Sequence, residues 1–214
     1  MTSVGRIVRN PLPVLAAALG LALASLVSCA APEALHKQDF IMDTAISLTL
    51  YSDRGEELAA AIFKRLKTID GLVRVQQETS EAWAINAAAG REAVTVSDDT
   101  LSIASIALDL AKLSNGAFDP TIGPISLLWN IEGETPHVPT AEELQVLLPL
   151  VDWHRVRIDA AKKQVFLEKA GMQLDFGGVA KGYAALDSAR ICREYGVRSA
   201  LLNMGDGSIY ALGS

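Results

Sequence analysis

A chain of 214 residues is long enough for one domain with a sizeable hydrophobic core, and 16 glycines and 8 prolines are too few for a collagen-like or low-complexity protein. Lysine and arginine (19) are outnumbered by aspartate and glutamate (25), so the net charge of −6 gives no electrostatic reason to expect nucleic-acid binding. Two cysteines are too few for a disulfide-stabilised scaffold.

The first 28 residues have the pattern of a bacterial lipoprotein signal peptide. Arg6 and Arg9 form a positive segment, and the uncharged stretch 12–27 has the length of a signal-peptide core but is marginal for a membrane span. This stretch ends in Leu26-Val27-Ser28-Cys29, which resembles a lipobox, the motif whose cysteine carries lipid such as palmitate. An ordinary signal peptide or a short anchor helix, with Cys29 incidental, is the alternative.

This pattern predicts a domain order and a location. We expect a signal peptide over residues 1–28, a tether over 29–39 and a folded domain over 40–214. With lipid on Cys29, the chain is expected at the extracytoplasmic face of the bacterial membrane, on the periplasmic side in a Gram-negative cell. Because the chain is acidic, the lipid and not attraction to anionic headgroups is expected to hold it there.

The first half of the mature chain predicts a strand followed by helices. Residues 46–51 alternate apolar and hydroxyl side chains, which indicates a strand. Ser52 or Asp53 is expected to cap a helix that runs to about Gly71, and residues 72–92 look irregular and polar.

Further along, a short strand near 94–96 precedes a helix capped by Ser97 and ended by Asn115-Gly116. Thr140 to Glu143 is a capping box that opens a short helix. The remaining expected elements are a hairpin (156–158 and 165–167), strands at 172–176, 200–203 and 209–211, and a helix over 179–195. Mixed helices and hairpins predict the α+β class.

The stretch from Asp175 to Tyr183 carries the clearest chemical signal. A carboxylate precedes Gly177-Gly178, where the backbone can turn and approach a ligand closely. The helix that follows offers free N–H groups and positive potential, and Lys181 adds a full charge, which suits phosphate. Taken alone, the stretch is equally consistent with a tight turn and a surface lysine.

Two other segments stand out less. The loop 116–124 contains two glycines and two prolines around Asp119, so it is expected to be rigid, although a plain connection is equally consistent. Met42-Asp43-Thr44 at the entry to the first strand says little on its own, since methionine there is usually a core residue.

Together these segments resemble the ApbE-type FAD:protein FMN transferases, from about Met42 to Gly213. The matching pieces occur in the family's order: Met42-x-Thr44, Ser80-Glu81 with Asn86, Ser114-x-Gly116-Ala117-Phe118-Asp119-Pro120-Thr121-x-Gly123-Pro124, Leu127-x-Trp129, Leu174-Asp175-x-Gly177-Gly178-x-Ala180-Lys181-Gly182-Tyr183, and Asn203-x-Gly205. The long loop and the glycine turn are the most specific of these.

The resemblance implies a flavin site. The residues implied to contact FAD are Met42, Ala117, Phe118, Asp119, Asp175 and Lys181. The residue at Gly178 is implied to give Mg²⁺ an oxygen, which here must be its backbone carbonyl, and hard Mg²⁺ prefers oxygen. No residue is identified as the catalytic base.

The implied reaction moves the FMN half of FAD onto a threonine or serine hydroxyl of an exported or membrane flavoprotein and releases AMP. FAD is thus a substrate, the acceptor flavoprotein is a partner, Mg²⁺ is a cofactor, and no nucleic acid is involved. Neutralising two phosphates and holding them in line is the main requirement of such a transfer.

Three departures from the family pattern affect these expectations. Gln76 stands where members usually carry a tyrosine or tryptophan that stacks on the flavin, a contact worth about 0.5–1.5 kcal/mol. The stretch Gly205-Asp206-Gly207-Ser208 replaces the usual Gly-Gly-Asp. Family members also continue beyond the point that corresponds to Ser214, into a part that supplies an aspartate and a threonine to Mg²⁺, so we expect a C-terminally truncated, inactive form.

Two further functions stay open. Gln76 and the expected lack of metal ligands fit a non-catalytic, lipid-anchored flavin-binding or scaffold protein. A plain α+β substrate-binding lipoprotein is the third possibility, but it leaves the two motif-like segments unexplained.

Overall fold

The computed structural model of the chain describes residues 33–131, 133–205 and 207–213. The chain divides into two units, residues 1–33 and 34–214, and all elements below belong to the second. The expected signal peptide and Cys29 lie outside the described residues. In the part of the chain that is described, no helix is both long and apolar enough to cross a membrane.

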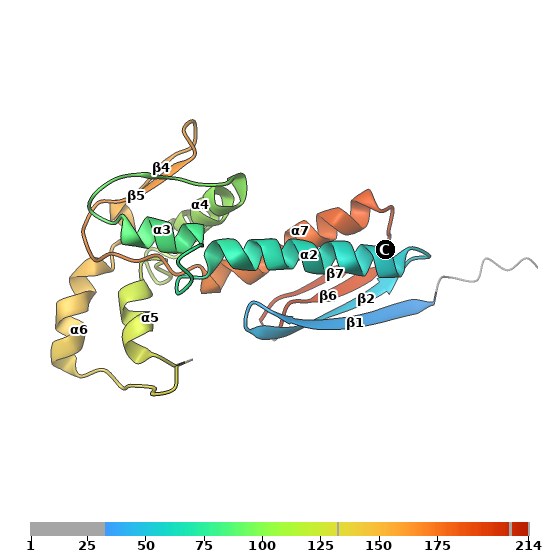
Figure 1. Cartoon of the computed structure of the whole chain (residues 1–214), viewed down its shortest axis with the longest axis horizontal. Coiled ribbons are helices and arrows are strands. Elements are labelled where there is room, and N and C mark those ends of the chain that lie inside the picture. The colour runs from blue at the N-terminus through green and yellow to red at the C-terminus, as the bar shows by residue number, and fades with distance from the viewer. Residues whose placement is uncertain (1–32, 132, 206, 214) are drawn as a thin grey trace, which may run out of the picture. The chain divides into compact units, whose positions relative to one another are not determined.

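Helices and strands are mixed along the described chain (Figure 1). The strands are β1 Ala34–Ile41, β2 Thr44–Tyr51, β3 Val94–Thr95, β4 Val156–Asp159, β5 Gln164–Leu167, β6 Ala200–Asn203 and β7 Ile209–Leu212. The α-helices are α2 Gly55–Val73, α3 Glu81–Ala87, α4 Asp98–Leu113, α5 Gly123–Trp129, α6 Ala141–Leu147 and α7 Gly177–Glu194; short 3₁₀ turns cover Leu148–Leu150 and Trp153–Arg155. The predicted α+β class is confirmed.

A four-stranded antiparallel sheet forms the larger layer, in the order β1-β2-β6-β7, and α2 and α7 lie together on one face of it (Figure 1). The strands turn alternate residues toward these helices, so that Ile46, Leu48 and Leu50 of β2 are buried. The apolar stripe predicted on α2 is buried in full, and it consists of Leu58, Ile62, Leu66 and Ile69. Hydrophobic burial therefore fixes α2 on the sheet.

A second, three-stranded sheet has the order β3-β5-β4 and contains the predicted hairpin. Two predicted helix caps are also confirmed. The Ser97 side chain accepts a hydrogen bond from the Thr100 N–H, and Thr140 and Glu143 form the reciprocal capping box at the start of α6. By contrast, α2 begins after Arg54, which offers no side-chain cap, so the cap expected at Ser52 or Asp53 is wrong.

The tether expected over residues 29–39 is wrong for its second part. Residues 34–41 form β1, which pairs with β2 along its whole length, from Ala34 opposite Tyr51 to Ile41 opposite Thr44. β1 is an edge strand with one face in solvent, and its exposed positions include His36 and Gln38, so the sequence carries no continuous apolar signal.

Two other local expectations fail. Residues 172–176 form an extended segment with one isolated bridge, from Gln173 to Ile122, instead of a strand. Helix α3 forms in the stretch 72–92 that was expected to be irregular, and α5 forms where no helix was predicted; each has seven residues. Helices this short have too few turns to give a visible period.

Candidate functional site

A pocket of about 760 Å³ opens where four parts of the fold meet. Its walls come from the turn between β1 and β2, the end of α2, helix α5 with its flanks, and the start of α7. The lining residues are Met42, Asp43, Asp70, Val73, Arg74, Val75, Gln76, Ile122, Gly123, Ile125, Ser126, Leu127, Trp129, Asn130, Ile131, Asp175, Gly177, Ala180 and Lys181. The pocket thus combines an apolar wall with five charged groups.

The turn into α7 forms the polar wall. The Asp175 carboxylate accepts a hydrogen bond from the Gly177 N–H at 2.8 Å, which fixes the carboxylate over the first residue of the helix. A Cβ atom on Gly178 would lie 2.8 Å from Cε2 of Phe118, so only glycine fits here without displacing that ring. The close neighbour of this turn is therefore Phe118, and the close approach of a ligand stays a prediction.

The extended segment before Asp175 is held by a side chain in place of a neighbouring strand. The Asn86 amide accepts from the Leu174 N–H at 2.7 Å and donates to the Leu174 carbonyl at 3.0 Å. Next to it, the Asp175 N–H donates to the Pro120 carbonyl at 2.8 Å. Asn86 and the 116–124 loop thus fix the position from which the turn starts.

The 116–124 loop lies directly against this segment. The Gly123 N–H donates to the Gln173 carbonyl at 3.2 Å, and a Cβ atom on Gly123 would come within 2.6 Å of that oxygen. About fifty residues separate loop and turn in the sequence, so tertiary folding alone brings these two segments together.

Asp119 organises the loop internally. Its Oδ1 accepts from the Thr121 N–H at 2.8 Å and from the Thr121 hydroxyl at 2.6 Å, and its Oδ2 accepts from the Trp153 N–H at 3.1 Å. The Thr121 hydroxyl in turn accepts from the Asp152 N–H at 2.8 Å. Both carboxylate oxygens of Asp119 are therefore engaged, and the rigidity expected from the glycines and prolines of this loop stays a prediction.

The β1–β2 hairpin reaches the pocket through a strained turn. Met42 and Asp43 are its two central residues, and both have positive φ, +57° and +55°. Two-residue hairpin turns of this kind favour Asn and Gly, and a residue such as methionine adopts this backbone at a cost of about 1–3 kcal/mol. This turn places the buried Met42 on the pocket wall.

Arg74 ties that turn to the end of α2. Its Nη2 lies 3.0 Å from Oδ1 of Asp43, and its Nε lies 3.0 Å from Oδ1 of Asp70. These partners, Asp70 first, raise the pKa of the Arg74 guanidinium. Lys181 differs, because it is half-buried on the pocket wall and makes no ion pair with any described residue. Lys181 is therefore the cation of this wall that is available to an anionic ligand.

Sequence comparison assigns the chain to a family. The family model described as "ApbE family" matches residues 42–214. The chain belongs to the ApbE family. The resemblance inferred from the motifs is confirmed, and the matched segment holds all of the pocket.

Similar proteins from other organisms carry one functional name. The chain is 36% identical over 173 residues to a Klebsiella pneumoniae protein named FAD:protein FMN transferase, covering 81% of this chain and 54% of that protein. A Treponema pallidum protein with the same name is 32% identical over 186 residues, covering 83% and 51%. The ApbE-family chain thus spans about half the length of the curated relatives it matches.

Solved structures share the fold. The ApbE protein of Thermotoga maritima superposes with a TM-score of 0.74 at 30% identity, covering 84% of this chain and 57% of that one. The flavin transferase ApbE of Vibrio cholerae gives a TM-score of 0.78 at 24% identity, covering 85% and 60%. The expected ApbE-like fold is therefore confirmed.

The structure brings together some of the predicted flavin contacts. Met42, Asp175 and Lys181 line the pocket. Phe118 touches the turn at Gly178 but does not line the pocket, Asp119 is engaged by Thr121 and Trp153, and Ala117 is exposed. Contact of these six residues with FAD stays a prediction.

The described residues do not fit a self-sufficient magnesium site. Among them, no group of three or more His, Cys, Asp and Glu side chains is arranged to hold a metal ion. Asp43 and Asp70 are paired with Arg74, and Asp175 accepts from the Gly177 N–H. Coordination of Mg²⁺ by Gly178 therefore stays a prediction from the resemblance.

Sequence reasoning missed most of the apolar wall and the Arg74 pair. The wall residues Ile125 and Leu127 lie on a helix too short to be recognised. Arg74 lies in the stretch expected to be irregular, with partners at 4 and 31 residues' separation. Two signals were useful: the Leu127-x-Trp129 motif, and Gln76, singled out as a departure from the family; all three residues line the pocket.

Proposed function

We propose that this chain provides the flavin-nucleotide site of an FAD:protein FMN transferase. The observation that carries the proposal is the composition of one pocket: the available cation Lys181 at the start of a helix, and an apolar wall from α5 and the end of α2. A helix N-terminus with a lysine suits a pyrophosphate, and an apolar wall suits a flavin ring. The names of the relatives support the same reaction.

The proposed reaction is a phosphoryl-group transfer. The hydroxyl oxygen of a threonine or serine in an acceptor flavoprotein forms a bond to the phosphorus of the FMN half of FAD. The bond between that phosphorus and the bridging oxygen breaks, and AMP leaves with that oxygen and the electron pair. The hydroxyl proton passes to water or to a base, a role that we assign to no described residue.

Lys181 has a defined part in this scheme. Its ammonium group neutralises charge on the pyrophosphate as the bridging bond breaks, and the positive end of the α7 dipole adds to the same potential. Gly177 and Gly178 bring no side chains of their own to this end of the helix, where the Phe118 ring and the Asp175 carboxylate lie close to them. Dependence on Mg²⁺ is expected from the resemblance alone.

The test uses the protein encoded by the complete reading frame that contains these 214 residues. Incubated with FAD, Mg²⁺ and a threonine-containing acceptor, it should make a covalent FMN adduct, detected by mass spectrometry, and EDTA should prevent this. Lys181→Ala should slow transfer about ten- to a hundredfold, because a charge-assisted contact contributes about 1.5–3 kcal/mol.

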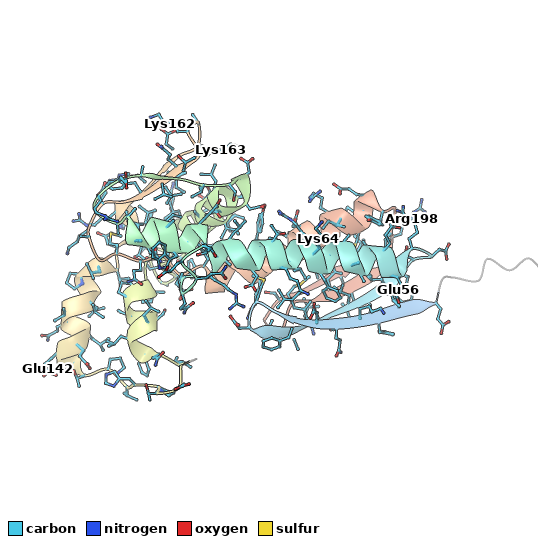
Figure 2. The ribbon with its side chains drawn as sticks, viewed as in Figure 1. Glu56, Lys64, Glu142, Lys162, Lys163 and Arg198 are labelled. Carbon is cyan, nitrogen blue, oxygen red and sulfur yellow. The ribbon has the colours of Figure 1, made fainter. Side chains whose placement is uncertain are left out.

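Lys162→Ala is the matched control. Lys162 lies on the β4–β5 hairpin (Figure 2), pairs with Asp159 at 3.1 Å and does not line the pocket. This variant should transfer FMN at the parental rate. Equal rates for both lysine variants would contradict the role of Lys181, and a protein that never labels an acceptor would contradict the proposed reaction.

A non-catalytic flavin-binding or scaffold role is the second candidate. Gln76 favours it, because this residue lines the pocket where family members carry a stacking aromatic ring. Such a protein would bind FAD but never label an acceptor, so the assay above separates the two candidates.

We further propose that the protein is anchored by lipid on Cys29 at the extracytoplasmic face of the bacterial membrane. The lipobox-like sequence at Cys29 supports this. Cys29→Ser should leave the membrane fraction or stay unprocessed. The matched control is Cys192→Ala, since Cys192 is fully buried and burial raises the pKa of its thiol to about 11. Unchanged processing and localisation of Cys29→Ser would contradict the anchor.

A further inference from the structure

Trp129 ends α5 with its side chain on the pocket wall. The residue is 37% exposed and lines the pocket. Its backbone is fixed, because the Trp129 carbonyl accepts from the His137 N–H at 3.0 Å and Asn130 ends the helix with φ of +46°. The backbone that carries the indole is therefore fixed at the pocket wall by an ordered helix end.

The other two tryptophans are placed differently. Trp153 stacks on His154, with ring centroids 3.9 Å apart, and Trp83 lies on α3. Neither lines the pocket, and of all the described residues around it Trp129 alone is aromatic. No stacking or cation–π partner is found for Trp129 among the described residues.

The position of Trp129 relative to the polar wall, which carries Lys181, suits a nucleotide with a ring system at one end. Helix α5 starts at Gly123, which contacts Gln173 two residues before Asp175. Six residues later, at 1.5 Å of rise per residue, Trp129 lies about 9 Å further along the axis. Between the two ends, the lining includes Ile125 and Leu127.

Gln76 lines the same pocket, but its amide has no aromatic face. We propose that Trp129 supplies the missing face and stacks on the isoalloxazine ring of the bound flavin, with the phosphates toward Lys181. This rests on the proposed flavin site. It makes Trp129 the residue that selects a flavin ring at the apolar end of the pocket.

The test separates ring from phosphate by using two ligands. Riboflavin has the ring without phosphate, and ADP has the pyrophosphate without the flavin. Trp129→Leu should weaken riboflavin binding about two- to tenfold, the range expected for loss of one aromatic stack, and should leave ADP binding unchanged. Lys181→Ala should do the reverse.

Fluorescence of bound riboflavin reports direct contact. An indole stacked on a photoexcited flavin quenches it by donating an electron, which returns to the indole, whereas a phenyl ring does not. Bound riboflavin should therefore be dark in the wild type and bright in Trp129→Phe, which keeps most of the affinity. Trp83→Phe, outside the pocket, should stay dark.

Each outcome decides between the claims. Riboflavin that binds Trp129→Leu as tightly as the wild type, or that stays dark in Trp129→Phe, would overturn the stacking proposal and leave the flavin site intact. A loss of ADP binding in Trp129→Leu would place adenine at the ring and overturn it too. Failure of the wild type to bind FAD, riboflavin or ADP would overturn both the stacking proposal and the proposed function.

Discussion

The turn into α7 and the wall made by α5 enclose the same pocket but are built in opposite ways. The turn is one contiguous stretch, residues 175–181, in which carboxylate, glycines and lysine follow each other. The wall combines α5 with residues 73–76 at the end of α2, and these meet only after folding. A site encoded locally can be recognised in a sequence, whereas a wall assembled from distant apolar residues cannot.

The largest expected effect tests whether the turn at 175–181 keeps its shape without a side chain that is distant in the sequence. Asn86→Leu removes both hydrogen bonds to the buried Leu174 backbone, and each orphaned group costs about 1–3 kcal/mol. We expect the free energy of unfolding to fall by roughly twice that amount. Urea unfolding measures the loss.

Gln164→Leu is the control for Asn86→Leu, because it removes an exposed amide whose only side-chain hydrogen bond among the described residues is a 3.3 Å contact to Thr95. It should change stability by less than about 1 kcal/mol. If Asn86→Leu proved equally mild, the turn would hold its own shape, and the dependence on a distant side chain would be refuted.

Two matched glycine substitutions test the contact between the start of α5 and the segment that leads into the α7 turn. Gly123→Ala places a methyl group 2.6 Å from the Gln173 carbonyl oxygen, so we expect destabilisation of about 1–3 kcal/mol. Gly182→Ala meets nothing within 4 Å inside α7, so we expect stabilisation of about 0.5–1 kcal/mol. Thermal unfolding shows whether each variant is more or less stable than the wild type. A change of the same sign in both variants would contradict the close contact between Gly123 and the Gln173 carbonyl.

The hairpin side of the wall is expected to respond weakly. Asp43→Asn removes the charge opposite Arg74 while keeping a residue that tolerates positive φ. Both side chains are partly exposed, so the loss should be about 0–1 kcal/mol and should disappear in 1 M salt. A larger loss that persists in high salt would mean that Asp43 acts through packing.

The smallest effect concerns the far side of α7, where Tyr183 donates to Asp99 at 2.7 Å. Burial, and then this hydrogen bond, raise the pKa of Tyr183 to about 12. A raised pKa contributes stability that is present below pH 10 and lost as the pH rises toward 12. In an absorbance titration of the four tyrosines, Tyr183→Phe should remove the last step; an unchanged profile would contradict its burial.

The sequence predicts well whatever is encoded within one turn of chain or one helix period. The apolar stripe of α2 and the caps at Ser97 and Thr140 follow from neighbours a few residues apart. The fold class follows from the same local patterns.

Three of the failures share one physical cause, which is that the stabilising partner is remote. β1 is a strand because β2 pairs with it, and 172–176 is not a strand because Asn86 and the loop around Pro120 bond its backbone instead. Arg74 could not be assigned to the pocket without Asp43, 31 residues away.

The two hydrogen bonds between the Asn86 amide and the Leu174 backbone limit where the chain can change in length around this site. Asn86 and Leu174 are 88 residues apart, yet a single amide fixes which residue of the extended segment faces it. Insertions in the exposed connections between them change loop-closure entropy only slowly, so the site tolerates growth or shortening there. Between Leu174 and Gly177 there is no such freedom, because one added or deleted residue would move the carboxylate of Asp175 and Lys181 relative to Asn86. Homologues that carry insertions or deletions should therefore have none between these two positions.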